Sequence, residues 1–152
     1  MPTRPMQSFT LTPHPATPSD AVRGIDGHVS RTPGGLQVRY VLTGNLNQVR
    51  VPKPSAPRFV DDLWRHTCFE MFVADKGQPG YHEFNFSPSG EWAVYAFARR
   101  RERAPLDVAI PVEALNPHVT VGRGREKLEL DAVLPLDRLS PRYAGARLML
   151  GL

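Results

Sequence analysis

Several side chains near the middle of the sequence are of types that bind ligands, and their spacing places them on one side of an extended chain. His66, Cys68 and Glu70 alternate along one run, and alternate residues of a β-strand point to the same face. The next run carries Glu83 and Asn85 at the same two-residue spacing. Carboxylates and amides exchange hydrogen bonds with hydroxyl groups. The pattern therefore predicts a polar binding surface on two neighbouring strands.

Two tryptophans flank these runs. Trp64 precedes the first run and is expected to overhang the rim of the polar surface. Trp92 follows the four residues 87–90, Ser-Pro-Ser-Gly, which are typical of a turn between antiparallel strands. A tight turn would bring Trp92 opposite Asn85 and onto the same surface. Sugar rings stack on aromatic side chains while polar groups bind their hydroxyls. The sequence therefore predicts a carbohydrate-binding surface formed by Trp64, Glu70, Glu83, Asn85 and Trp92.

The same part of the chain resembles a known group of domains. Two stretches carry the resemblance, residues 61–72 (DDLWRHTCFEMF) and residues 81–90 (YHEFNFSPSG). They are similar to the Leu-Trp…Glu-x-Phe strand and the Tyr-x-Glu-Phe-x-x-x-Pro-x-Gly hairpin of DOMON-like domains related to family 9 carbohydrate-binding modules. The resemblance is specific over residues 61–97 and weak elsewhere. It implies a β-sandwich that binds a ligand without catalysis.

The resemblance also implies roles for single residues. In the sugar-binding relatives, two tryptophans sandwich the terminal sugar of a chain. Trp64 matches the first tryptophan, Glu70 matches a hydroxyl-binding carboxylate, and Asn85 matches an amide on the neighbouring strand. The second tryptophan of the relatives comes from a strand near the C-terminus, and no tryptophan follows Trp92 in this sequence. An interaction domain that has lost the sugar surface is therefore the alternative function.

Other chemistries are open to the same residues. His66 and Cys68 are metal-ligand types that could hold Zn²⁺ together with Glu70 and a donor from the next strand. Glu70 and Glu83 could be the two carboxyl groups of a glycosidase. Cys68 as a nucleophile would need a well-aimed base, which a neighbour on the same strand face supplies poorly. Because a polar strand face contains such residues in any case, we expect neither an enzyme nor a metal site.

Haem and nucleic acid are two further ligand classes. Some DOMON domains hold haem between Met and His, and Met71, Met149 and His118 are of those types, although methionines on strand faces are usually core residues. The arginine-rich run 99–103 could meet phosphates, but a solvated strand end explains it as well. We therefore expect a small-molecule ligand, no resident cofactor and no nucleic-acid partner.

The remaining sequence predicts the framework. Sixteen prolines in 152 residues leave no stretch for a long periodic helix, which excludes helical bundles, coiled coils and doubly wound α/β folds. Short runs separated by Gly and Pro predict an all-β, antiparallel, jelly-roll-like sandwich in one domain over residues 1–152. We expect a helical turn at 135–139 and strands at 8–12, 25–32, 36–42, 66–73, 81–86, 92–97, 106–112, 119–121, 127–134 and 146–152.

Charge, cysteine content and the chain ends complete the sequence-based expectations. The net charge is +4, and the single cysteine excludes an internal disulfide. The sequence contains no apolar run of about 18 residues, so no membrane span is expected. Residues 1–12 lack a basic and then apolar leader, which predicts a location in a bacterial-type cytoplasm. The strand-like run 147–152 predicts that a further C-terminal strand is missing and that the exposed edge pairs with a second copy.

Overall fold

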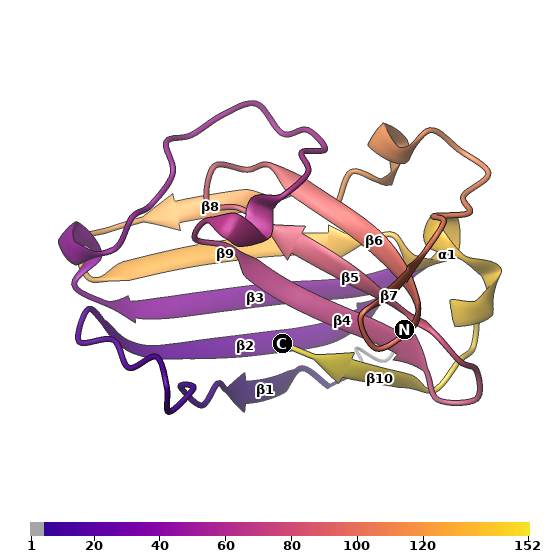
Figure 1. Cartoon of the computed structure of the whole chain (residues 1–152), viewed down its shortest axis with the longest axis horizontal. Helices are drawn as coiled ribbons and strands as arrows, with labels where there is room; N and C mark the ends of the chain where they lie inside the picture. The colour runs from indigo at the N-terminus through magenta and orange to yellow at the C-terminus, as the bar shows by residue number, and fades with distance from the viewer. Residues whose placement is uncertain (1–4) are drawn as a thin grey trace.

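The protein is built from two antiparallel sheets that pack face to face (Figure 1). The structure, a computed structural model, describes residues 5–152. In that part of the chain, sheet A has the strand order β1-β2-β3-β9-β8 and sheet B the order β10-β4-β5-β6-β7. This arrangement confirms the predicted all-β sandwich, and its jelly-roll type stays a prediction. The strands are β1 (Gln7–Thr10), β2 (Val22–Thr32), β3 (Gly35–Gly44), β4 (Phe69–Asp75), β5 (Tyr81–Phe86), β6 (Trp92–Arg99), β7 (Glu102–Ala104), β8 (Thr120–Arg123), β9 (Lys127–Leu134) and β10 (Leu148–Gly151).

The core lies between the sheets because alternate residues of the central strands are apolar. In β3, every second residue from Leu36 to Leu42 is buried, and in β4 the same holds from Phe69 to Val73. Phe84 and Phe86 of β5, the neighbour of β4 in sheet B, belong to the same buried cluster. Burial of each such side chain stabilises the fold by about 1.5–3 kcal/mol relative to exposure. The predicted inward face of residues 67–73 is thus confirmed at Phe69, Met71 and Val73.

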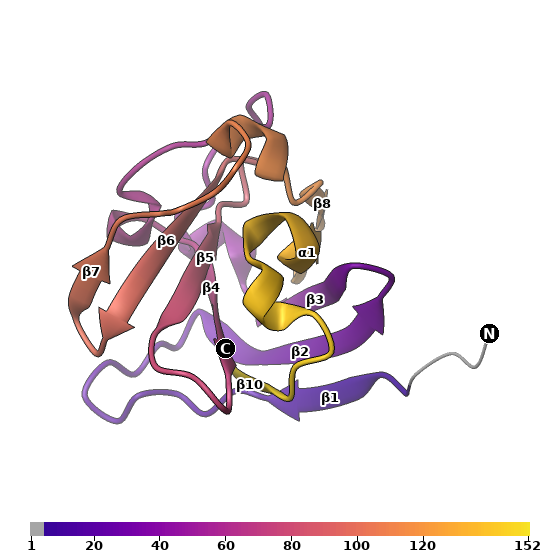
Figure 2. The same ribbon diagram turned by 90° about the vertical axis from the view of Figure 1, so that its right-hand side faces the viewer.

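A short helical stretch closes one end of the sandwich (Figure 2). Helix α1 (Leu136–Leu139) and the 3-10 turn η4 (Pro141–Tyr143) follow β9, and their Leu136, Leu139 and Tyr143 side chains are buried in the core. The helical turn predicted at 135–139 is therefore confirmed. No helix within residues 5–152 has the length and apolar character needed to cross a membrane.

The strand predicted at residues 106–112 is wrong. This segment is irregular up to the 3-10 turn η3 (Val112–Leu115), and the strand that follows β6 and pairs with it is β7, which lies earlier, at the end of the arginine-rich run. Prolines at positions 105 and 111 bracket the segment and disfavour a regular strand. Its alternating apolar residues arise because a loop packs Leu106, Val108 and Ile110 against the core.

The hairpin between β5 and β6 places Trp92 inside the sandwich, so its predicted position on the polar surface is wrong. The Ser87 amide donates to the Glu91 carbonyl at 2.8 Å, and this pairing sets the register that puts Trp92 opposite Phe86. Ala93, one residue later, is the partner of Asn85. Because a one-residue shift moves a side chain to the other face, Trp92 points into the core and is only 1% exposed.

Candidate functional site

The predicted polar residues lie on the face of sheet B that points away from the core, which we call the outer face. Glu70 of β4 is the cross-strand partner of Asn85 of β5, and Phe72 is the partner of Glu83. Glu83 in turn pairs with Tyr95 of β6. The structure therefore brings Glu70, Glu83 and Asn85 together on one face, whereas Trp92 lies on the opposite one.

Aromatic side chains continue the outer face beyond the carboxylates. The rings of Tyr81 and Phe97 stack with centroids 4.9 Å apart and planes 6° apart. Phe72 meets Tyr81 edge to face at 6.0 Å. The Arg103 guanidinium from β7 lies 4.3 Å from the centroid of the Tyr95 ring. Polar and aromatic groups thus share the outer face over four neighbouring strands, as in surfaces that bind amphipathic ligands.

Two carboxylates and a thiol influence one another on the outer face. Partial burial raises the pKa of Glu70, and the nearby charge of Glu83 raises it further. Burial raises the pKa of the Cys68 thiol to about 12, with smaller contributions from the same two carboxylates. Carboxylate oxygens accept hydrogen bonds from hydroxyl groups. The pair therefore suits a ligand rich in hydroxyl groups.

One end of the outer face is covered by residues 58–66, which we call the η2 segment because it contains the 3-10 turn η2 (Leu63–Arg65). In Figure 1 its magenta coil lies at the arrow end of β5, the strand that the turn contacts. The Trp92 amide donates to the Arg58 carbonyl at 3.1 Å, and the Val60 amide donates to the Trp92 carbonyl at 2.9 Å. The Tyr95 hydroxyl donates to Asp61 Oδ1 at 3.0 Å. These bonds fix the segment to β6.

Beneath the η2 segment lies a small buried layer separate from the main core. Leu63, Asn85 and Ala93 are all buried, yet they lie outside the cluster that fills the space between the sheets. Asn85 is 0% exposed, and neither its Oδ1 nor its Nδ2 has a hydrogen-bond partner among residues 5–152. Leaving buried polar atoms without partners is unfavourable by about 1–3 kcal/mol each. Trp64, on the opposite side of the same turn, is 51% exposed.

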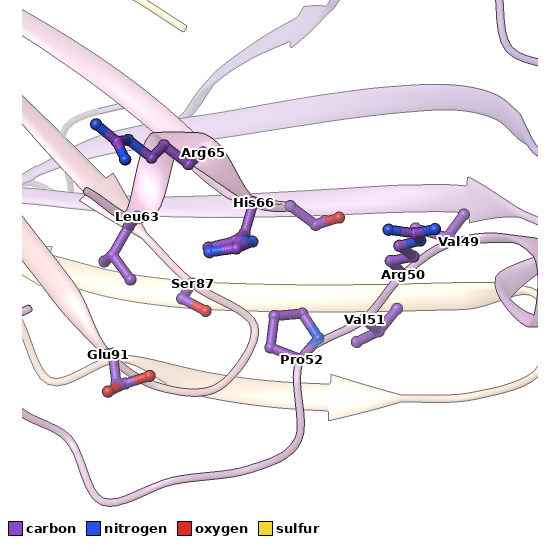
Figure 3. A pocket seen from close by; sticks show the side chains of 10 residues that line it. Val49, Arg50, Val51, Pro52, Leu63, Arg65, His66, Ser87 and Glu91 are labelled. Carbon is purple, nitrogen blue, oxygen red and sulfur yellow. The ribbon is translucent and has the colours of Figure 1, made fainter. Parts of the chain in front are cut away.

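The η2 segment also forms one wall of a cavity of about 870 Å³ that is open to solvent (Figure 3). The residues after β3 form the opposite wall, and the β5–β6 hairpin forms the floor. In Figure 3, His66 and Ser87 point toward the space beside Pro52, and Arg50 approaches from the far wall. The lining consists of Val49, Arg50, Val51, Pro52, Leu63, Arg65, His66, Thr67, Ser87 and Glu91.

Hydrogen bonds hold the walls of this cavity in place. Arg123 of β8 donates both to the Pro52 carbonyl and to the Pro88 carbonyl, the latter at 2.8 Å, and so ties the Pro52 wall to the hairpin floor. The Ser55 amide donates to the Ser89 carbonyl at 2.9 Å. Arg58 Nε donates to Glu91 Oε2 at 3.1 Å. Because both sides are fastened to the same hairpin, the cavity is formed without a ligand.

Sequence reasoning did not find this cavity. The three prolines within residues 51–57 indicated only an irregular loop, and nothing in the local pattern shows that the loop faces the η2 segment. His66, expected beside Cys68 as a metal-ligand type, is an exposed residue of the cavity wall. Among residues 5–152, no three His, Cys, Asp or Glu side chains are grouped so as to hold a metal ion.

Cys68 offers a direct check on the electrostatics of the outer face. Because its thiol has a pKa of about 12 instead of 9.0, the thiolate fraction near pH 8 falls by a factor of about 1,000. We expect a disulfide exchange reagent to react with the folded protein at least about 100-fold more slowly than with the protein in urea. The rate of thionitrobenzoate release measures this. Equal rates in both states would contradict the described environment of Cys68.

Comparisons of the chain with protein-family models, with curated proteins and with solved structures found no match.

Proposed function

We propose that this protein is a non-catalytic carbohydrate-binding domain whose ligand lies where the η2 segment meets the outer face. The observation that carries the proposal is the buried Asn85 amide, which has no partner and sits beside the half-buried Glu70 carboxyl. An exposed aromatic ring, Trp64, stands on the covering segment. A sugar supplies what this arrangement lacks, because its hydroxyls both donate and accept hydrogen bonds and its ring face stacks on indole.

The sequence resemblance of residues 61–97 to DOMON-like and family 9 carbohydrate-binding modules supports the same ligand class. In this proposal Trp64 stacks on the ring, and Glu70 and Glu83 bind hydroxyls. Trp92 takes no part, because it lies in the core. Asn85 is reached only where the η2 segment moves aside, so binding and movement of that segment are coupled.

Calorimetric titration with a panel of mono- and oligosaccharides tests the proposal. Trp64→Ala is expected to weaken the affinity for a bound saccharide about two- to tenfold, since loss of stacking is worth about 0.5–1.5 kcal/mol. Phe9→Ala is the matched control, because Phe9 is another exposed aromatic residue but belongs to β1 of sheet A. Unchanged affinity of Trp64→Ala, or no binding of any saccharide, would contradict the proposal. Turnover of an aryl glycoside that Glu70→Gln abolishes would contradict its non-catalytic part.

Asn85→Leu separates the proposed binding role from stability. Leucine has a similar size and brings no unpaired polar atoms, so the ligand-free variant is expected to gain about 1–3 kcal/mol of unfolding free energy. The same variant is expected to lose saccharide binding, because the amide no longer bonds to the ligand. Urea denaturation and the calorimetric titration measure the two effects. A less stable variant would show that the amide is already satisfied in the folded protein.

A further inference from the structure

We infer that the cavity beside the η2 segment binds an oxyanion, so that the saccharide of the proposed function is an acidic one, carrying a phosphate or a carboxylate group. The inference rests on the proposed function, which supplies the sugar site at Trp64. The anion is assigned to other residues, those that line the cavity. The cavity joins guanidinium, imidazole and hydroxyl side chains from three parts of the chain: Arg50, Arg65, His66, Thr67 and Ser87.

The charges of the lining favour an anion. Arg50 forms no ion pair with any residue that the structure describes, and Arg65 has only a distant one, its Nη2 being 3.9 Å from Asp62 Oδ2. The one carboxylate of the lining, Glu91, is already engaged by Arg58 at 3.1 Å and by the Ser89 hydroxyl at 2.9 Å. Arg50 and Arg65 therefore place positive charge at two opposite ends of the cavity (Figure 3). Guanidinium groups match the geometry of phosphate and carboxylate oxygens.

The neutral groups of the cavity complete such a site. Ser87 is buried at the end of β5, and its Oγ accepts from the Ser89 amide at 3.1 Å, which fixes its position at the floor. His66 points into the same space, and its ring can supply an N–H donor (Figure 3). Because Arg123 ties Pro52 to the hairpin at Pro88, the Pro52 wall and the floor that carries Ser87 are held together before the ligand arrives.

The cavity lies next to Trp64, the residue proposed to stack on the sugar. Trp64 lies between Leu63 and Arg65, and both of these line the cavity. The guanidinium carbon of Arg65 is 5.3 Å from the centroid of the Trp64 ring. A sugar stacked on Trp64 thus has a substituent within reach of Arg65 and of the cavity behind it. A volume of about 870 Å³ has room for a charged group and part of a sugar ring.

Calorimetric titrations with glucose, glucose 1-phosphate, glucuronate and inorganic phosphate test the inference. At least one of the two acidic sugars is expected to bind about tenfold more tightly than glucose. Comparison of glucose 1-phosphate with glucuronate shows whether the cavity prefers a phosphate or a carboxylate. Arg50→Ala is expected to remove this gain and leave the affinity for glucose unchanged. Arg65→Ala is expected to weaken both, because Arg65 also contacts Trp64. Arg23→Ala is the matched control, an exposed arginine of β2 in the other sheet.

The outcomes separate this inference from the proposed function. Equal affinities for glucose and for both acidic sugars, or a gain that survives Arg50→Ala, would overturn the oxyanion site even where sugar binding is real. Binding of inorganic phosphate that Arg50→Ala abolishes, without binding of any sugar, would support the oxyanion site and contradict the carbohydrate proposal. Arg50 is exposed in a loop, so a circular dichroism melt of each variant suffices to show that it is folded.

Discussion

Trp92→Ala is expected to lower the free energy of unfolding by about 3–5 kcal/mol, the range measured when large aromatic side chains are removed from protein cores. The Trp92 ring is 1% exposed, packs edge to face on Phe59 at 5.5 Å, and belongs to the cluster between the sheets. Its removal leaves a cavity that neighbouring strands cannot close, because their positions are fixed by the sheet ladders.

Trp64→Ala provides the matched comparison for this effect. Because half of the Trp64 side chain is in solvent, its loss is expected to change the free energy of unfolding by less than about 0.5 kcal/mol. Urea denaturation followed by far-ultraviolet circular dichroism measures both variants without relying on tryptophan emission. Similar destabilisation by the two substitutions would contradict the register that separates the two tryptophans.

Acidification is expected to destabilise the protein through His82, by about 2–3 kcal/mol between pH 7 and pH 4.5. His82 lies on the inner face of β5, 8% exposed, with its Nδ1 2.5 Å from the Tyr143 hydroxyl. Burial, and to a smaller extent the positive charge of Arg142, together lower the pKa of His82 from 6.5 to about 4. Between these two values the unfolded chain binds a proton at His82 that the folded chain does not. Stability therefore falls as the pH drops through 6.5 and levels off below about 4.

A His82→Gln variant isolates this contribution. Glutamine keeps a polar group beside Tyr143 but does not titrate. Glu70 acts in the opposite direction, because its pKa is raised in the folded state and protonation there favours folding. Since Glu70 is present in both proteins, the difference between their unfolding free energies at each pH reports His82 alone. A difference that stays constant from pH 7 to pH 4.5 would contradict the buried, neutral state of His82.

Local pattern predicted the sandwich well because alternation of apolar residues reflects burial on one face. The runs in β3, β4 and β5 each have one apolar face, and all three face the core. The pattern failed at residues 106–112, where a loop that alternately touches the core imitates a strand. It also failed at Trp92, since a turn of Ser-Pro-Ser-Gly allows more than one register and only the pairing of Ser87 with Glu91 decides between them.

The local sequence pattern likewise predicted only part of the candidate site. Glu70 and Asn85 could be placed opposite one another from strand alternation, and the structure has them as cross-strand partners. Asn85 is buried beneath the η2 segment because of the path of a proline-rich loop. The sequence of this loop has no periodic pattern of apolar residues from which its path could be predicted. The cavity is a product of the same path, because Arg50 and His66 meet there only through long-range packing.

Quenching of tryptophan emission by acrylamide tests the central claim, saccharide binding at Trp64, most directly. Trp92 is buried and Trp64 is half exposed, so Trp64 dominates the quenching of the native protein. We expect a bound saccharide to lower the quenching constant saturably. The Trp64→Phe variant retains a ring for stacking, so it is expected still to bind the saccharide but to show no such change in quenching. A quenching constant that no saccharide of the panel alters would contradict a sugar site on the η2 segment.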